Sequence, residues 1–241
     1  VIASDRRTLV VGLGKTGLSC VRYLTGLGRE VSVADSRALP PGMDELRADY
    51  PDIEVRTGEF DSDWFRTFNE LVVSPGIAVA EPAIAAAAEQ GAHIRGDIDL
   101  FAEAAQAPII AITGSNGKTT VTTLVGELAK ACGVRAAVGG NIGTPALELL
   151  EQTPDVYILE LSSFQLETTH ELNAEVATVL NVSDDHMDRY PSKMAYYQAK
   201  QRIFRGARNA VVNQDDALST PMARDTLNFI CYGFHRVNPE T

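Results

Sequence analysis

The sequence predicts an α/β protein: a Rossmann-like amino-terminal domain followed by a P-loop-type central domain, each with a mostly parallel sheet. Three observations support this class. Short apolar runs alternate with helical stretches along the chain, which is the pattern of βαβ units. The runs are apolar almost throughout, as expected for strands that helices cover on both faces. Glycine-rich patterns typical of phosphate-binding loops follow two of these runs directly.

The first domain is expected to span residues 1–95. A helix is predicted after its first strand because Leu18, Val21 and Leu24 fall on one helical face. A later alanine-rich helix is expected to end at Gly91, since glycine commonly stops a helix. The predicted elements in chain order are strand Thr8–Val11, helix Thr16–Leu27, strand Glu30–Ala34, strand Leu71–Ser74 and helix Pro82–Gln90.

A second domain is expected over residues 96–241, because strand and helix alternate again after a short helix within residues 96–107. The chain stops soon after an apolar run, Phe229–Tyr232, without an evident final helix, so we expect this domain to be incomplete. Its other predicted elements are strand Pro108–Ile112, helix Lys118–Cys132, strand Arg135–Val138, strand Val156–Glu160, strand Val176–Val182, helix Ser192–Phe204 and strand Ala210–Asn213.

Composition and charge exclude several classes of protein. The 241 residues are 45% hydrophobic and 22% charged, as in a globular protein. The net charge is -11 without a basic cluster, which argues against a nucleic-acid partner. No apolar run approaches the roughly 20 residues that cross a bilayer, and no secretory signal is visible, so we expect a cytoplasmic protein without a membrane partner. We also expect a monomer. The three cysteines lack a C-x-x-C pair, so neither disulfides nor a cysteine zinc site is expected.

The first glycine-rich pattern, Gly12–Gly17, reads G-L-G-K-T-G and lies between a predicted strand and a predicted helix. This is the context in which G-x-G-x-x-G binds a pyrophosphate at a helix amino terminus. Asp35 ends the next predicted strand, 18 residues after Gly17, where an acid in this fold usually contacts a ribose or a base. The pattern favours a dinucleotide site, and the alternative is a glycine turn that only packs the helix on the strand.

The second pattern, Thr113–Thr120, reads T-G-S-N-G-K-T-T and again joins a strand to a long helix. The usual P-loop has a glycine where this chain has Ile112, so the match to G-x-x-x-x-G-K-[ST] is incomplete. Backbone amides here can still cradle phosphates, the Lys118 ammonium can reach β and γ oxygens, and the Thr119 hydroxyl can ligate magnesium. The alternative is a structural helix start with an exposed lysine. The residues expected to bind ATP are Gly114, Ser115, Asn116, Gly117, Lys118, Thr119 and Thr120.

Acidic residues follow two further strands of the second domain. Glu160 ends a buried strand, and the carboxyl end of a parallel strand is where ligands bind, so it can act as a magnesium ligand or be a solvated acid. The cluster Ser183–Asp188 follows the next strand and contains His186, which could ligate a second metal. Its alternative role is a turn or a helix cap by Asp184 or Asp185. Lys200 lies on a predicted helix, where a lysine usually faces solvent, and its chemistry alone gives it no special role.

Taken together, these motifs resemble the ATP-dependent Mur ligases of peptidoglycan synthesis. The resemblance covers essentially the whole chain and is spread over several motifs, which makes it specific. The segments that carry it are Gly12–Ser19, Ser74–Ile77, Ile112–Thr120, Gly139–Gly143, Glu160–Gln165 and Asn181–Asp188.

The resemblance implies that the first domain holds the UDP part of a sugar-nucleotide substrate, UDP-N-acetylmuramoyl-L-alanine, and not a nicotinamide cofactor. The glycine loop, with Gly14, Lys15 and Thr16, would lie beside the diphosphate. Asp35, Ser36 and Arg37 match positions that contact the uracil. The further positions that match substrate contacts or nearby helpers are Gly76, Asn141, Ser162, Gln165 and His186.

The same resemblance implies a catalytic centre that uses ATP and two magnesium ions. Lys118 and Thr119 would hold the ATP phosphates and one metal, with Glu160 and His186 on the second metal. Lys200 matches a lysine that the family carries as a carbamate, in the local pattern Y-x-x-A-K with Tyr196 as its tyrosine. A carbamate forms from a neutral amine, so a nearby metal or cation would have to lower the pKa of this lysine. Lys118, His186 and Lys200 are the implied catalytic residues.

The implied reaction is the addition of D-glutamate through an acyl phosphate. The family's third domain, which closes over ATP, has no counterpart in this sequence, so we expect this chain to bind the UDP substrate without completing ligation. Three alternatives stay open: a folylpolyglutamate synthase-like ligase, a nicotinamide-dependent oxidoreductase and a non-catalytic nucleotide-binding module. The first ninety or so residues argue against the first, and the phosphate loop argues against the second.

Overall fold

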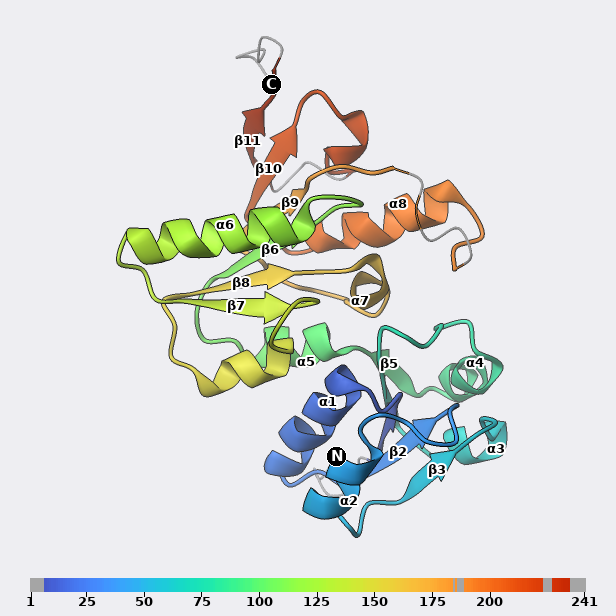
Figure 1. The fold of residues 1–241 in the computed structure, drawn as a ribbon. Helices are drawn as coiled ribbons and strands as arrows, with labels where there is room; N and C mark the ends of the chain where they lie inside the picture. The colour runs from blue at the N-terminus through green and yellow to red at the C-terminus, as the bar shows by residue number, and fades with distance from the viewer. Residues whose placement is uncertain (1–6, 184, 186–188, 223–226, 235–241) are drawn as a thin grey trace. The chain divides into compact units, whose positions relative to one another are not determined.

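The computed structural model describes residues 7–183, 185, 189–222 and 227–234. The chain forms two compact units, Val1–Leu100 and Phe101–Thr241. Each unit holds its own sheet with helices packed on it (Figure 1). Among the described residues, no helix is both long enough and apolar enough to cross a membrane.

The described part of the first unit is an α/β sheet domain with strand order β3-β2-β1-β4-β5, and its strand pairs are parallel. Its strands are β1 (Thr8–Val11), β2 (Val31–Asp35), β3 (Val55–Thr57), β4 (Glu70–Val73) and β5 (His93–Arg95). Its helices are α1 (Lys15–Gly26), α2 (Met43–Asp49), α3 (Ser62–Phe65), α4 (Pro82–Glu89) and α5 (Asp97–Ala104), the last of which runs into the second unit.

The core of the first unit is built on β1, β2 and β4, which are buried along their whole lengths. Aromatic side chains fill one side of it. Asp61 caps α3 by accepting a hydrogen bond of 2.9 Å from Asp63 N, and the short helix carries Trp64 and Phe65 into the core. Trp64 meets Phe68 edge to face, with ring centroids 5.1 Å apart.

The second unit holds a six-stranded sheet in the order β11-β10-β9-β6-β8-β7, again with parallel pairs. Its strands are β6 (Ile109–Thr113), β7 (Ala136–Gly140), β8 (Val156–Glu160), β9 (Val176–Val179), β10 (Asn209–Asn213) and β11 (Asn228–Tyr232). Its α-helices are α6 (Lys118–Ala131), α7 (Ser163–Glu167) and α8 (Lys193–Gln201). Its 3₁₀ turns are η2 (Ala146–Glu151), η3 (Arg202–Phe204) and η4 (Ala217–Ser219). The predicted fold class is confirmed.

Helices lie on both faces of this second sheet, and β7 shows which helix covers which face. A Cβ added to Gly126 of α6 would lie 2.9 Å from Cγ2 of Val138. A Cβ added to the next residue, Gly139, would lie 3.1 Å from Cδ1 of Leu149 in η2. Because consecutive strand residues point to opposite faces, α6 and η2 pack on opposite sides of the sheet.

Two predicted elements end three residues earlier than the sequence suggests. The strand predicted to run to Val182 stops at Val179, because the next residues leave the ladder to bond the loop after β6. The helix predicted to end at Phe204 changes to 3₁₀ geometry at Arg202. Tightening of a last helical turn into 3₁₀ geometry is common and leaves no trace in hydrophobic spacing.

Candidate functional site

The glycine loop of the first unit follows β1 at the place where the strand order reverses, between β1 and β4. Gly12 has φ +95°, a conformation that favours glycine, and its carbonyl accepts a 3.0 Å hydrogen bond from Ser74 Oγ. A Cβ on Gly17 would overlap the Gly12 carbonyl oxygen. The first turn of α1 can therefore approach the loop only because position 17 is glycine.

Asp35 is fully buried at the end of β2 and ties this loop to the next one. Its Oδ2 accepts a 2.6 Å hydrogen bond from Leu13 N, and its Oδ1 accepts from Arg37 Nε at 2.8 Å. Burial raises the pKa of Asp35, but the bonds from Arg37 and Leu13 outweigh it, so the pKa lies below its ordinary value. Asp35 is thus a charged anchor for both loops.

The other residues predicted for the first unit gather at the same edge of its sheet. They follow β1, β2 and β4, which are neighbours and parallel, so their carboxyl ends meet. These residues are exposed or half-buried and therefore accessible to a ligand. These residues are Gly14, Lys15, Thr16, Ser36, Arg37 and Gly76.

The phosphate loop of the second unit joins β6 to α6. Gly117 precedes the helix with φ +78°, the left-handed conformation. The helix that starts at Lys118 has 14 residues, and its free first amides favour an anion. The usual P-loop pattern has a glycine at position 112. Here Ile112 is part of β6, and the strand, loop and helix are still formed. Gly114, Ser115, Asn116, Gly117, Lys118, Thr119 and Thr120 thus form one strand–loop–helix turn.

Two lysines meet at one backbone carbonyl in this loop. Lys118 Nζ donates to Gly114 O at 2.9 Å and to Ser115 O at 3.1 Å, and Lys200 Nζ donates to the same Gly114 O at 2.9 Å. The expectation that a helix lysine faces solvent is wrong for Lys200, which is 1% exposed. Its ammonium lies 4.6 Å from the ring centre of Tyr196.

The pKa of Lys200 is lowered to about 7, first by burial and then by the charge of Lys118, while Asp185 acts in the opposite direction. A large fraction of this amine is therefore neutral near pH 7. A neutral lysine amine is a nucleophile, which an ordinary exposed lysine is not at this pH.

Glu160 ends β8 beside the phosphate loop and is 1% exposed, so the alternative of a solvated acid is wrong. Its Oε2 accepts from Thr119 Oγ1 at 2.8 Å, and its Oε1 accepts from Asn141 Nδ2 at 2.7 Å. Asn141 N also donates to the Glu160 carbonyl at 2.8 Å. These contacts fix the carboxylate in one orientation.

The oxygen atoms of Thr119 and Glu160 are ligands of the kind that magnesium prefers. Within the described residues, no group of three or more His, Cys, Asp or Glu side chains could hold a metal ion by itself. Magnesium usually takes several of its ligands from bound phosphate and water. His186, the other predicted ligand, lies outside the described residues, as does Asp184.

Asn181 and Tyr196 hold the phosphate loop in place, and sequence reasoning gave neither of them this role. Asn181 Oδ1 accepts from Asn116 N at 2.9 Å, and Asn181 Nδ2 donates to Asn116 O at 3.0 Å. The Tyr196 hydroxyl lies 3.0 Å from Ser115 Oγ. The strand order could have indicated the role of Asn181. Because β9 adjoins β6 in the sheet, the residues that follow β9 meet the loop that follows β6.

Ser162 and Gln165 form a capping box on α7. Ser162 Oγ accepts from Gln165 N at 3.2 Å, and Gln165 Oε1 accepts from Ser162 N at 3.1 Å. The pair therefore caps the start of α7, which follows the carboxyl end of β8 and Glu160.

The fold and this site define a P-loop-type α/β protein with a Rossmann-like unit before it. The Mur ligase MurD-like N-terminal domain matches residues 6–96, and the Mur ligase middle domain matches residues 112–239. The chain belongs to the Mur ligase family, which confirms the resemblance seen in the motifs.

Curated relatives agree with this family. The chain is 76% identical over all of its 241 residues to the UDP-N-acetylmuramoylalanine–D-glutamate ligase of Marinobacter nauticus, and covers 54% of that protein. It is 57% identical over 98% of its length to the ligase of the same name from Pseudomonas aeruginosa, and covers 53% of it. The chain spans about half the length of the curated relatives it matches.

Solved structures of distant relatives share the fold. One is the UDP-N-acetylmuramate:L-alanyl-gamma-D-glutamyl-meso-diaminopimelate ligase from Neisseria meningitides, with TM-score 0.57 and 16% identity over 88% of this chain and 72% of that one. Another is UDP-N-acetylmuramate-alanine ligase from Thermotoga maritima, with TM-score 0.52 and 22% identity over 93% of this chain and 52% of that one.

Replacing Gly17 by alanine should destabilise the first unit, because the added Cβ overlaps the Gly12 carbonyl. We expect the free energy of unfolding to fall by about 3 kcal/mol. The single tryptophan, Trp64, lies in this unit and reports its unfolding in urea by fluorescence. Gly14→Ala is the matched control, because its Cβ would meet open space; we expect its effect to stay within about 0.5 kcal/mol. Equal urea midpoints for the two variants would contradict this interpretation of the loop.

The titration of Lys200 should make stability depend on pH. Its pKa is about 7 when folded against 10.5 as the ordinary value, so the unfolded chain binds more protons between these pH values. In carbon dioxide-free buffer, wild type should therefore gain stability over Lys200→Met from about pH 7 to pH 10, by at most about 1.4 kcal/mol per pH unit. Denaturant unfolding at several pH values measures this difference.

Lys193→Met, at an exposed lysine on the same helix as Lys200, is the matched control for that titration. If the difference between wild type and Lys200→Met stays constant over this pH range, the Lys200 amine is not held in the buried state described above.

Proposed function

We propose that this chain is part of an ATP-dependent ligase that adds D-glutamate to UDP-N-acetylmuramoyl-L-alanine and acts as a monomer. The observation that carries the proposal is the convergence of Lys118, Lys200, Thr119 and Glu160 on one phosphate loop. Curated relatives that match the whole chain or nearly all of it bear the name of this ligase, which supports the choice of substrates.

In this proposal, the loop and the start of α6 bind the phosphates of ATP. The amides of residues 114–119 donate to phosphate oxygens, and Lys118 exchanges its bonds to Gly114 O and Ser115 O for bonds to the β and γ phosphates. Thr119, Glu160 and His186 would hold magnesium at two sites, and the bound metal would neutralise phosphate charge.

Lys200 has the properties that a carbamate requires. Its neutral amine can attack carbon dioxide, forming an N–C bond and releasing one proton, which converts a neutral group into an anion. The product would sit beside Gly114 and Lys118, where an anion can help hold a metal that the bare ammonium would repel. Mass data showing an extra carboxyl group on Lys200 would support this step.

The first unit would hold the uridine diphosphate. Gly14, Lys15 and Thr16 lie at the loop that would face the diphosphate, and Ser36 and Arg37 lie where the uracil would bind. Asp35 would act partly by holding these loops together, since Leu13 N and Arg37 both bond its carboxylate. Gly76 follows β4 at the same edge, whereas Asn141, Ser162 and Gln165 belong to the second unit.

The chemistry would run in two steps. The carboxylate of the substrate's L-alanine attacks the γ phosphorus of ATP and releases ADP, which gives an acyl phosphate. The amine of D-glutamate then attacks the acyl carbon, forms the amide and releases phosphate. This chain's residues supply positioning and charge neutralisation, which are the main requirements of phosphoryl transfer.

Titration calorimetry with UDP-N-acetylmuramoyl-L-alanine, NADH and a folate tests this assignment against the oxidoreductase and folate-ligase alternatives. We expect only the sugar nucleotide to bind at micromolar strength or better. Asp35→Ala should weaken that binding at least about tenfold, which is 1.4 kcal/mol. Lys118→Ala should leave it unchanged while removing ATP-dependent turnover in a chain of the relatives' length, by at least about 100-fold.

Asp49→Ala, at an exposed acid of the first unit, controls for the loss of a negative charge. Unchanged binding in Asp35→Ala would overturn the assignment of the first unit. Glutamate-dependent phosphate release by residues 1–241 alone, at the rate of the longer protein, would show that these residues complete the reaction and contradict the expectation that they only bind substrate.

A further inference from the structure

The carboxylate of Asp35 has all of its acceptor positions filled by groups of the chain itself. Its Oδ1 accepts hydrogen bonds from the Arg37 backbone N at 2.9 Å and from Arg37 Nε at 2.8 Å. Its Oδ2 accepts from Leu13 N and from Arg37 Nη2, both at 2.6 Å. An ionised carboxylate offers about four lone-pair positions, two on each oxygen, and these four donors fill them. A ligand can therefore bond Asp35 only after one of the four donors leaves.

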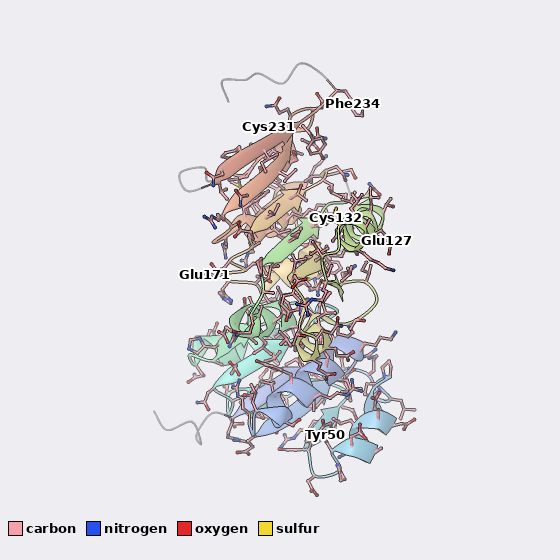
Figure 2. The ribbon with its side chains drawn as sticks, turned by 90° about the vertical axis from the view of Figure 1, so that its left-hand side faces the viewer. Tyr50, Glu127, Cys132, Glu171, Cys231 and Phe234 are labelled. Atoms are coloured by element: carbon pink, nitrogen blue, oxygen red, sulfur yellow. The ribbon has the colours of Figure 1, made fainter. Side chains whose placement is uncertain are left out.

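Two of the four donors are backbone amides that the surrounding loops hold in place. Leu13 N belongs to the glycine loop, and the Leu13 carbonyl accepts a 3.1 Å hydrogen bond from Gly42 N at the far end of the loop that follows β2. This loop leads into α2, after which Tyr50 is labelled in Figure 2. The backbone around Asp35 is thus fixed independently of the Arg37 side chain.

The other two donors belong to the Arg37 guanidinium, which can move away by rotation within its own side chain. That side chain is 51% exposed, whereas the side chain of Asp35 is fully buried. Within the described part of the chain, every hydrogen bond of the Arg37 side chain goes to Asp35. Water can solvate a guanidinium that turns outward, so a half-exposed pair opens at little cost. The guanidinium is therefore the donor group that a ligand can replace.

The pairing explains how an ionised acid is kept at this buried position. Burial alone would raise the pKa of Asp35, and the bonds from Arg37 do most to lower it below its ordinary value. A buried carboxylate without a partner would be costly. A ligand that displaces the guanidinium must therefore bring a donor of its own, while Leu13 N and Arg37 N keep the carboxylate in its orientation.

The two positions that the guanidinium would free suit a planar ring with an N–H donor at its edge. They lie side by side, one on each oxygen, because the guanidinium binds both oxygens at once. The pyrimidine ring of uracil carries such a donor at N3. The displaced guanidinium, only two residues from Asp35, stays near the ring and can stack on its face or donate to a ring carbonyl.

We propose that Arg37 is an internal occupant of the base subsite: its guanidinium bonds the Asp35 carboxylate until a uracil base displaces it. This inference rests on the proposed function, because the ligand is the uridine sugar nucleotide. Binding then requires the open state of Arg37, and the observed association rate constant is the intrinsic one multiplied by the fraction of open molecules. Arg37 thereby regulates how fast the first unit takes up its nucleotide.

Stopped-flow association of UDP with a ribose-linked fluorescent group, in a chain of the relatives' length, tests the proposal. Arg37→Met removes the occupant, so its association rate constant should exceed that of wild type at least about threefold. Arg37→Lys keeps a cation but loses the paired donors, so it should also associate faster than wild type. Urea unfolding, followed by Trp64 fluorescence, shows that each variant is folded.

Arg66→Met is the matched control for the loss of a positive charge, which by itself would slow the approach of an anion. Arg66 is an arginine of the first unit with similar exposure, and it pairs with Asp63 at 2.6 Å. Its association rate constant should stay within about 1.5-fold of the wild-type value. Rate constants for Arg37→Met and Arg37→Lys at or below that of this control would overturn the proposal.

A crystal structure of the same chain with UDP-N-acetylmuramoyl-L-alanine provides the second measurement. We expect a ring N–H of the ligand within hydrogen-bond distance of the Asp35 carboxylate and the Arg37 guanidinium displaced from it. Binding with both guanidinium bonds retained would overturn this inference and leave the proposed function standing. If neither nucleotide binds to wild type, the proposed function of the first unit fails, and this inference fails with it.

Discussion

Two lysine amines held at one carbonyl oxygen are the feature on which the second unit's chemistry depends. Lys118 and Lys200 both donate to Gly114 O, so two amines lie close together where the phosphate loop opens. Burial and this proximity keep the pKa of Lys200 near 7. The same loop places the Glu160 carboxylate against Thr119. A site with one lysine cation, a second amine that titrates near neutral pH and one fixed acid is suited to polyanions that carry a metal.

The parallel topology creates this arrangement. Strands β8 and β9 flank β6, so Glu160 after β8 and Asn181 after β9 both reach the loop that follows β6. Helix α8 adds Tyr196 and Lys200 from one side, at positions four residues apart and therefore on one face. In the first unit the buried Asp35 acts similarly, because it links the loops after β1 and β2. In both units, buried polar contacts fix the loops at the carboxyl ends of the strands.

The sequence predicts the helices and strands better than the long-range hydrogen bonds that hold the loops between them. Strands Thr8–Val11 and Val156–Glu160 match the structure at both ends, because long apolar runs with clear boundaries fix them. The short strands β3 and β5, with three residues each, and the 3₁₀ turn η2 carry too little periodicity to be seen. The hydrophobic pattern could not predict the burial of Lys200 either. A lysine on a helix is expected to face solvent unless a distant partner, here Gly114 O, is known to bind it.

The central claim is that Lys200 loses its charge near neutral pH because it is buried beside a second cation. The most direct measurement is an NMR titration of the Lys200 side chain, labelled at Cε, in buffer free of carbon dioxide and assigned with Lys200→Met. The account predicts a midpoint at about pH 7. A midpoint near 10.5, the ordinary value for lysine, would contradict it and would place this amine in solvent rather than at the phosphate loop.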